Sequence, residues 1–94
     1  MLKIRTVCGN GIGSSLFCAG KIREILEEEG IKADVESVDF SSAPSHKADL
    51  YITVKELAQQ FDSQFKVAII RSYTNAKKLR EDVLDTIKEL NANL

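Results

Sequence analysis

The chain has 94 residues, 44% of them hydrophobic, and its 13 basic and 14 acidic side chains give a formal net charge of −1. This length and composition predict one globular domain, residues 1–94, and argue against a disordered chain. The balanced charge argues against a nucleic-acid partner, because a nucleic-acid-binding domain of this size normally carries a basic excess.

The first half of the chain reads as strand, glycine loop, helix and strand. Residues 2–7 are rich in branched side chains, as expected of a strand, and three glycines then interrupt the pattern. Ser14 and Ser15 are suited to cap the helix that follows. That helix is predicted to end near Glu29, just before Gly30. Its apolar stripe consists of Cys18, Ile22, Ile25 and Leu26.

Strands and helices continue to alternate in the second half. Three further strands are predicted, at residues 33–38, 48–54 and 65–70. A loop at 41–46 and a short helix at 55–61 separate them. Asn75 opens the last helix, whose apolar face carries Ala76, Leu79, Val83, Ile87 and Leu90.

This alternation predicts an α/β fold with a parallel sheet and right-handed crossovers. In such folds, ligands bind beyond the carboxyl ends of the strands, where the strand order switches. Cys8 and the glycines follow the first strand directly, so we expect chemistry there.

The loop after the first strand reads Cys8-Gly9-Asn10-Gly11-Ile12-Gly13-Ser14-Ser15. Glycines let backbone N–H groups point inward, and a helix N-terminus adds a positive dipole end. The pattern predicts an anion cradle around a nucleophilic thiol. The alternative from these residues is an ordinary buried cysteine beside a tight turn.

Three common loops are excluded by the residues of this segment. A nucleotide P-loop needs a lysine before its last Ser or Thr, and the glycine spacing is not GxGxxG. Cysteine phosphatases hold phosphate with an arginine six residues after the cysteine, and Ser14 occupies that position.

The stretch from Val7 to Ser15 resembles the phosphorylation loop of IIB components of the phosphoenolpyruvate-dependent sugar phosphotransferase system. Within the lactose, cellobiose and ascorbate IIB superfamily it is most similar to the ascorbate type, whose loop reads Cys-Gly-x-Gly-x-Gly-Ser-Ser. The segment Ala48-Asp49-Leu50-Tyr51-Ile52 resembles the third strand of that family. The resemblance covers nearly the whole chain.

The resemblance implies a three-layer, four-stranded parallel sheet of order 2-1-3-4 with helices on both faces, flavodoxin-like and similar to low-molecular-weight phosphatases. It also implies a phosphotransferase. Cys8 would accept a phosphoryl group from a phosphohistidine of a IIA protein, and Gly9 through Ser15 would form the cradle. The group would then pass to a sugar, ascorbate or a related compound, at the membrane IIC transporter.

Two other functions stay open at this point. One is a low-molecular-weight cysteine phosphatase, against which the missing arginine at Ser14 counts. The other is a thiol-based regulatory module. Apart from the loop, Arg71 follows the fourth strand, and we expect either an auxiliary charge for the phosphate or partner, or a solvated arginine.

Three further candidates for a role beside Cys8 are Cys18, His46 and Phe17. Cys18 is expected to be a small core residue and His46, the only histidine, an exposed loop residue. Phe17 lies off the apolar stripe, and both a docking patch around Cys8 and packing against the loop after the second strand remain open.

Neither a membrane span nor a metal site is expected. No apolar run approaches the roughly 20 residues that a span needs, and the charges at Lys3 and Arg5 do not suit a signal peptide. The predicted location is the cytoplasm, without membrane insertion. Two cysteines without a CxxC pair and one histidine predict no metal, and no cofactor is expected.

Overall fold

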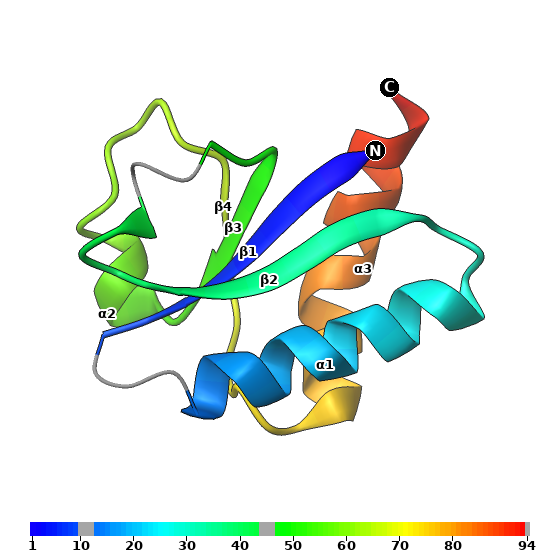
Figure 1. The fold of residues 1–94 in the computed structure, drawn as a ribbon, viewed down its shortest axis with the longest axis horizontal. Coiled ribbons are helices and arrows are strands. Elements are labelled where there is room, and N and C mark those ends of the chain that lie inside the picture. The colour runs from blue at the N-terminus through cyan, green and yellow to red at the C-terminus, as the bar shows by residue number, and fades with distance from the viewer. Residues whose placement is uncertain (10–12, 44–46, 94) are drawn as a thin grey trace.

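The protein forms a parallel sheet of four strands with three helices in the computed structural model, which describes residues 1–9, 13–43 and 47–93 (Figure 1). The strands are β1 (Leu2–Cys8), β2 (Ala33–Asp39), β3 (Leu50–Thr53) and β4 (Val67–Ile69). The helices are α1 (Gly13–Glu28), α2 (Lys55–Ala58) and α3 (Ala76–Ala92). All three strand pairs are parallel and their order is β2-β1-β3-β4, which confirms the predicted sheet.

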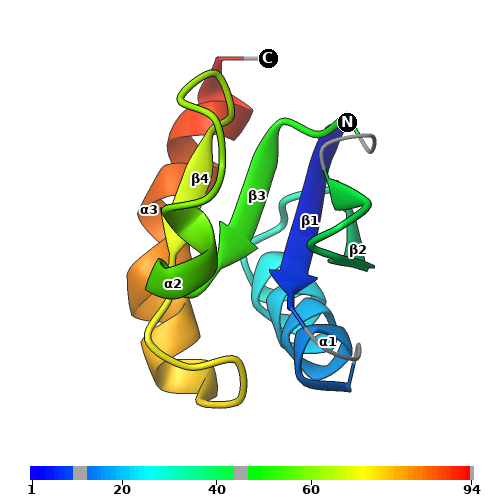
Figure 2. The ribbon, with the colours of Figure 1, turned by 90° about the vertical axis from the view of Figure 1, so that its left-hand side faces the viewer.

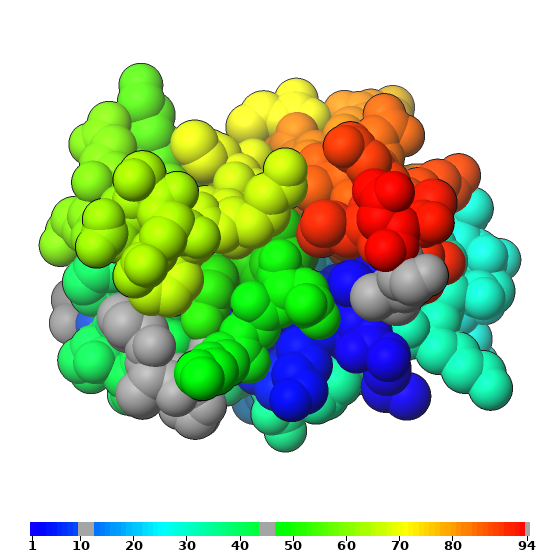
Figure 3. Space-filling model, turned by 90° about the horizontal axis from the view of Figure 1, so that it is seen from above, coloured from blue at the N-terminus to red at the C-terminus, as the bar shows by residue number. Residues whose placement is uncertain are grey.

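Helices lie on both faces of the sheet, as predicted. Helices α1 and α3 pack on one face around the larger core, which includes Ile4, Ile22, Leu50 and Val83. The other face carries a smaller core around Val7, Val38, Ala43 and Tyr51, with the partly buried rings of Phe40, Phe61 and Phe65 packed against it. The arrows of β1 and β3 point the same way, toward the start of α1 (Figure 2). The first residues of β1 and the last turn of α3 lie at the other end of the molecule (Figure 2), the end that faces the viewer in Figure 3.

The structure confirms the predicted helix boundaries at Gly30 and at Asn75. Gly30 has φ of 71°, and the Ile31 N–H donates to the carbonyl of Leu26 over 2.9 Å, which is the hydrogen-bond pattern of a glycine C-terminal cap. At the start of α3, the side chain of Asn75 accepts a hydrogen bond from the N–H of Lys78.

The start of α1 differs from the prediction. The helix begins at Gly13, so Ser14 and Ser15 lie within its first turn and neither is the cap. Ser15 is fully buried instead of facing the solvent at a helix end.

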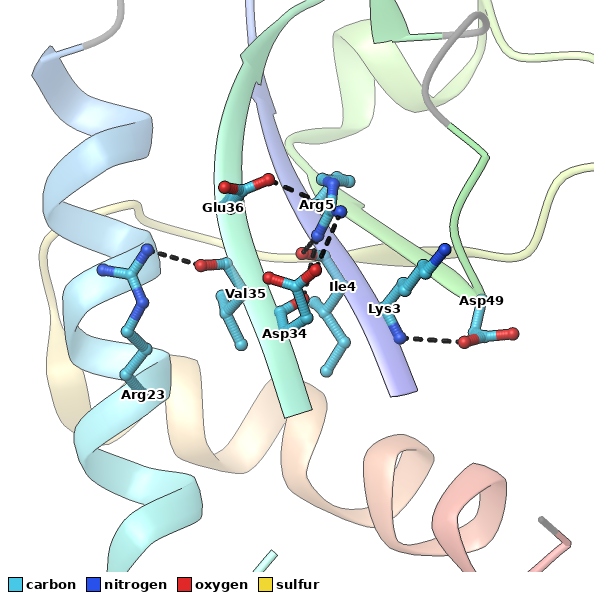
Figure 4. Close-up of polar contacts among 8 residues, drawn as sticks. All are labelled: Lys3, Ile4, Arg5, Arg23, Asp34, Val35, Glu36 and Asp49. Carbon is cyan, nitrogen blue, oxygen red and sulfur yellow. Dashed lines mark hydrogen bonds and ion pairs between the residues drawn. The ribbon is translucent and has the colours of Figure 1, made fainter. Parts of the chain in front are cut away.

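The third strand is also shorter than predicted, and a side chain explains its start. The N–H of Lys3 donates to the carboxylate of Asp49 over 2.8 Å, where a regular ladder would use a backbone carbonyl (Figure 4). Helix α2 and strand β4 likewise cover less than the predicted 55–61 and 65–70.

A buried arginine joins the two strands nearest the N-terminus. Arg5 of β1 is 7% exposed, and its guanidinium forms ion pairs with Asp34 and Glu36 of β2 at 3.3 and 3.5 Å (Figure 4). It also donates to the backbone oxygen of Asp34 over 2.9 Å. These contacts fix β1 beside β2 and thus the strand that carries Cys8.

Candidate functional site

Cys8 is the last residue of β1 and lies where the strand order switches. From β1 the chain continues through α1 to β2 on one side, whereas β3 lies on the other side. This is the place where open parallel sheets bind ligands. The Cys8 side chain is largely covered, with 6% of the residue exposed.

Ser15 brings a hydrogen-bond donor from the first turn of α1 to the Cys8 sulfur. Its hydroxyl donates to Cys8 Sγ over 3.2 Å. The Ser15 carbonyl in turn accepts a hydrogen bond of 2.7 Å from the hydroxyl of Thr6, a buried residue of β1. The strand therefore holds the helix turn that faces the sulfur.

The start of α1 is open and free of negative side chains. Gly13 and Ser14 are exposed, and the first turn contains no acidic residue. A methyl group added at Gly13 would meet none of the described residues within 4 Å, and among the described glycines only Gly30 has positive φ. Gly13 therefore leaves space beside the helix dipole and is not required by backbone strain.

The remaining residues of the predicted cradle are only partly covered by the structure. Gly9 is exposed, and a methyl group there would lie 3.6 Å from a methyl carbon of Leu57 in α2, an ordinary contact. Asn10, Gly11 and Ile12 lie outside the described residues, so their predicted role in binding phosphate remains a prediction. His46 also lies outside them.

Three hydroxyl side chains near Cys8 were not predicted from the sequence. Besides Thr6, these are Thr53 at the end of β3 and Tyr73 after β4. Both donate to the carbonyl oxygen of Val7, over 2.9 Å from Thr53 and 2.5 Å from Tyr73. A polar residue at the carboxyl end of an otherwise apolar strand is the sequence signal that indicates Thr6 and Thr53.

Burial keeps Tyr73 protonated. It raises the pKa of the Tyr73 phenol above its ordinary value, although hydrogen bonds with Thr53 and Val54 lower that pKa in part. The phenol is therefore a hydrogen-bond donor at neutral pH. Burial also raises the pKa of Cys18 to about 12, which with its 0% exposure confirms a core residue.

Arg71 lies after β4 at the same edge of the sheet as Cys8. Its side chain is 53% exposed and forms ion pairs with Glu81 at 2.9 Å and Asp82 at 2.8 Å, both on α3. Burial raises the pKa of Asp82, but the hydrogen bonds from Arg71 outweigh it, and the pKa lies below its ordinary value. Phe17 is 46% exposed on the second turn of α1.

The part of the chain that the structure describes contains no group of three or more His, Cys, Asp or Glu side chains that could hold a metal ion. None of its helices is long and apolar enough to cross a membrane.

Comparison with solved structures shows the fold. A low-molecular-weight protein tyrosine phosphatase from Bacillus subtilis matches with a TM-score of 0.61 and 17% identity over 95% of this chain and 97% of that one. A YwlE mutant from Bacillus subtilis matches with a TM-score of 0.58 and 16% identity over 99% and 98%. At this identity, the likeness confirms the phosphatase-like sheet and does not assign an activity.

Sequence comparison shows the family. Residues 3–85 match the family described as the PTS system, Lactose/Cellobiose specific IIB subunit. The chain is also 32% identical over 71 residues to the ascorbate-specific PTS system EIIB component of Mycoplasma pneumoniae, covering 73% of this chain and 75% of the relative. The chain therefore belongs to the IIB family of the sugar phosphotransferase system, as the glycine loop predicted.

Proposed function

We propose that this chain is a phosphoryl carrier, a single-domain phosphotransferase, and that Cys8 forms the phosphocysteine intermediate. One observation carries the proposal: Cys8 ends β1 at the switch point, where Ser15 of the α1 N-terminus donates to its sulfur over 3.2 Å. Family membership supports the same chemistry and a cytoplasmic location.

In the first step, Cys8 Sγ attacks the phosphorus of a phosphohistidine on a IIA protein. The S–P bond forms as the N–P bond breaks, and the thiol proton passes to the imidazole of the donor. The residues proposed to surround the phosphoryl oxygens are Gly9, Asn10, Gly11, Ile12, Gly13, Ser14 and Ser15. Their backbone N–H groups and hydroxyls, together with the α1 dipole, stabilise the transferred charge.

In the second step, a hydroxyl of the sugar bound at the IIC transporter attacks the same phosphorus. The S–P bond breaks, and Cys8 takes up the proton that the hydroxyl loses. Ascorbate or a related compound is the proposed sugar, since the relative from Mycoplasma pneumoniae is named ascorbate-specific. Segment 9–15 contains no histidine and no acidic residue that would activate water, which suits a carrier.

Arg71 is proposed as an auxiliary charge at this edge. Its ion pairs with Glu81 and Asp82 orient a half-exposed guanidinium after β4. From there it would meet the phosphoryl group or an acidic partner surface.

A comparison of two phosphoryl donors tests this function against a phosphatase activity. We expect lasting, stoichiometric phosphorylation by a histidine-phosphorylated IIA protein and no turnover of an aryl phosphate ester. Cys8→Ser should abolish the labelling, whereas Cys18→Ala, which removes the other thiol, should retain it. Rapid ester hydrolysis, or label that survives in Cys8→Ser, would contradict the proposal.

A further inference from the structure

Two hydroxyl groups meet at the carbonyl oxygen of Val7, the residue before Cys8. Thr53 donates from the end of β3 over 2.9 Å, and Tyr73 donates from the segment between β4 and α3 over 2.5 Å. The two hydroxyl oxygens lie 3.3 Å apart. Segments 46 and 66 residues distant in sequence thus converge on one backbone atom.

These hydroxyls take the place of a regular ladder bond. The pairing of β1 with β3 ends at Thr6 and Ile52, and the chain turns out of the sheet into helix α2 at its N-cap residue, Val54. Because the chain leaves the sheet there, the Val7 carbonyl needs another donor to avoid being buried unpaired. Thr53 and Tyr73 supply it.

The Val7 carbonyl belongs to the peptide group that joins Val7 to Cys8. A peptide group is planar, so fixing the Val7 oxygen also fixes the plane that contains the Cys8 nitrogen and Cα. On the other side of β1, the Cys8 carbonyl accepts a hydrogen bond of 2.9 Å from the N–H of Phe40. Both peptide groups that flank the nucleophile are therefore held.

Tyr73 is itself well placed to act as an anchor. Its ring is half-buried and packs against the larger core. The adjoining turn is held by the hydroxyl of Ser72, which accepts hydrogen bonds from the N–H groups of Thr74 and Asn75 at 3.2 and 3.3 Å. The anchor is therefore connected to the start of α3.

We propose that Tyr73, together with Thr53, is a positioning residue for phosphoryl transfer. The two hydroxyls hold Cys8 in its place beside Ser15 and the N-terminal turn of α1. This role rests on the proposed function of Cys8. Neither hydroxyl needs to touch the phosphoryl group, because a small displacement of the nucleophile is enough to slow a transfer that depends on alignment.

The test combines transfer kinetics with a readout that needs no partner. Tyr73→Phe and Thr53→Val should each lower the transfer rate at saturating IIA donor by about three- to tenfold, the effect of one lost hydrogen bond. The donor concentration at half-saturation should stay unchanged. Thr53→Ser, which keeps the hydroxyl, should restore the rate. In NMR spectra of the unphosphorylated protein, the amide resonances of Cys8 and Ser15 should move in Tyr73→Phe.

Thr86→Val is the matched control for Thr53→Val, because it removes a threonine hydroxyl from the second half of α3. It should change neither the transfer rate nor those two resonances, whatever its effect on the melting temperature. Wild-type rates in both Tyr73→Phe and Thr53→Val, a Thr53→Ser variant as slow as Thr53→Val, or an effect confined to half-saturation would overturn the proposal. A wild-type protein that accepts no phosphoryl group refutes the proposed function instead, and the NMR comparison then decides alone whether Tyr73 anchors Cys8.

Discussion

Replacing Ser15 by alanine separates the structural and the chemical contribution of one hydroxyl. Ser15 is fully buried, and its hydroxyl donates to Cys8 Sγ over 3.2 Å. Losing a hydrogen bond between neutral groups costs about 1 kcal/mol of stability. A hydrogen bond to a charged group is roughly twice as strong, so a charged sulfur or bound phosphoryl group loses about 1 kcal/mol more. That difference corresponds to a transfer rate about fivefold lower.

Urea unfolding and transfer from a histidine-phosphorylated IIA protein measure the two contributions of Ser15 side by side. Ser63→Ala is the matched control, since it makes the same change at an exposed serine away from the loop. This variant should alter neither the free energy of unfolding nor the transfer rate. If Ser15→Ala loses about 1 kcal/mol of stability yet transfers at the wild-type rate, the hydroxyl only supports the fold, and the argument for charge stabilisation at Cys8 is refuted.

Three further predictions concern residues around the site and in the core. Gly13→Ala should slow phosphorylation without loss of stability, because the added methyl meets none of the described residues within 4 Å but narrows the approach to the helix start. Gly30→Ala should instead cost about 1 kcal/mol of stability, because φ is 71°, and should leave the transfer rate unchanged. Urea unfolding and transfer rates distinguish the two, and the reverse pattern would contradict the reasoning. Cys18 ionises more readily in the unfolded chain than in the folded one. The free energy of unfolding should therefore be unaffected by this thiol below pH 9.0 and should fall as the pH rises toward about 12. Denaturant unfolding of Cys18→Ala should show a weaker decline, and an equal decline would refute this cause. Arg71→Ala should slow transfer while the circular dichroism spectrum stays unchanged. It should also make the free energy of unfolding less sensitive to acid below pH 3.8, because the lowered pKa of Asp82 depends on the arginine. An unchanged transfer rate would show that Arg71 forms only a surface ion pair.

The order of elements could be predicted because its signals are local. Gly30 and Asn75 mark helix ends through their own backbone and side-chain preferences, and the structure has them in those roles. The position of Cys8 followed from strand–helix alternation, since parallel sheets place such a loop at the carboxyl edge. These inferences need only residues that are close together in the chain.

The anchors of the site could not be predicted in the same way. Tyr73 and Val7 are 66 residues apart, and no periodic pattern in either segment marks their contact. The helix start at Gly13 placed Ser15 inside the first turn, which converted an expected cap into a buried donor to the sulfur. Arg71 similarly meets carboxylates of α3, which only the packing of that helix beside β4 brings together.

Locating the phosphoryl group after transfer shows whether Cys8 itself carries it. The protein should be charged by a histidine-phosphorylated IIA protein, digested and examined by mass spectrometry, with iodine treatment of a parallel sample. We expect one phosphoryl group on the peptide that contains Cys8, removed by iodine as expected for a thiophosphate ester, and none in Cys8→Ser. A phosphoryl group on His46 or on a serine, with Cys8→Ser still fully labelled, would contradict it.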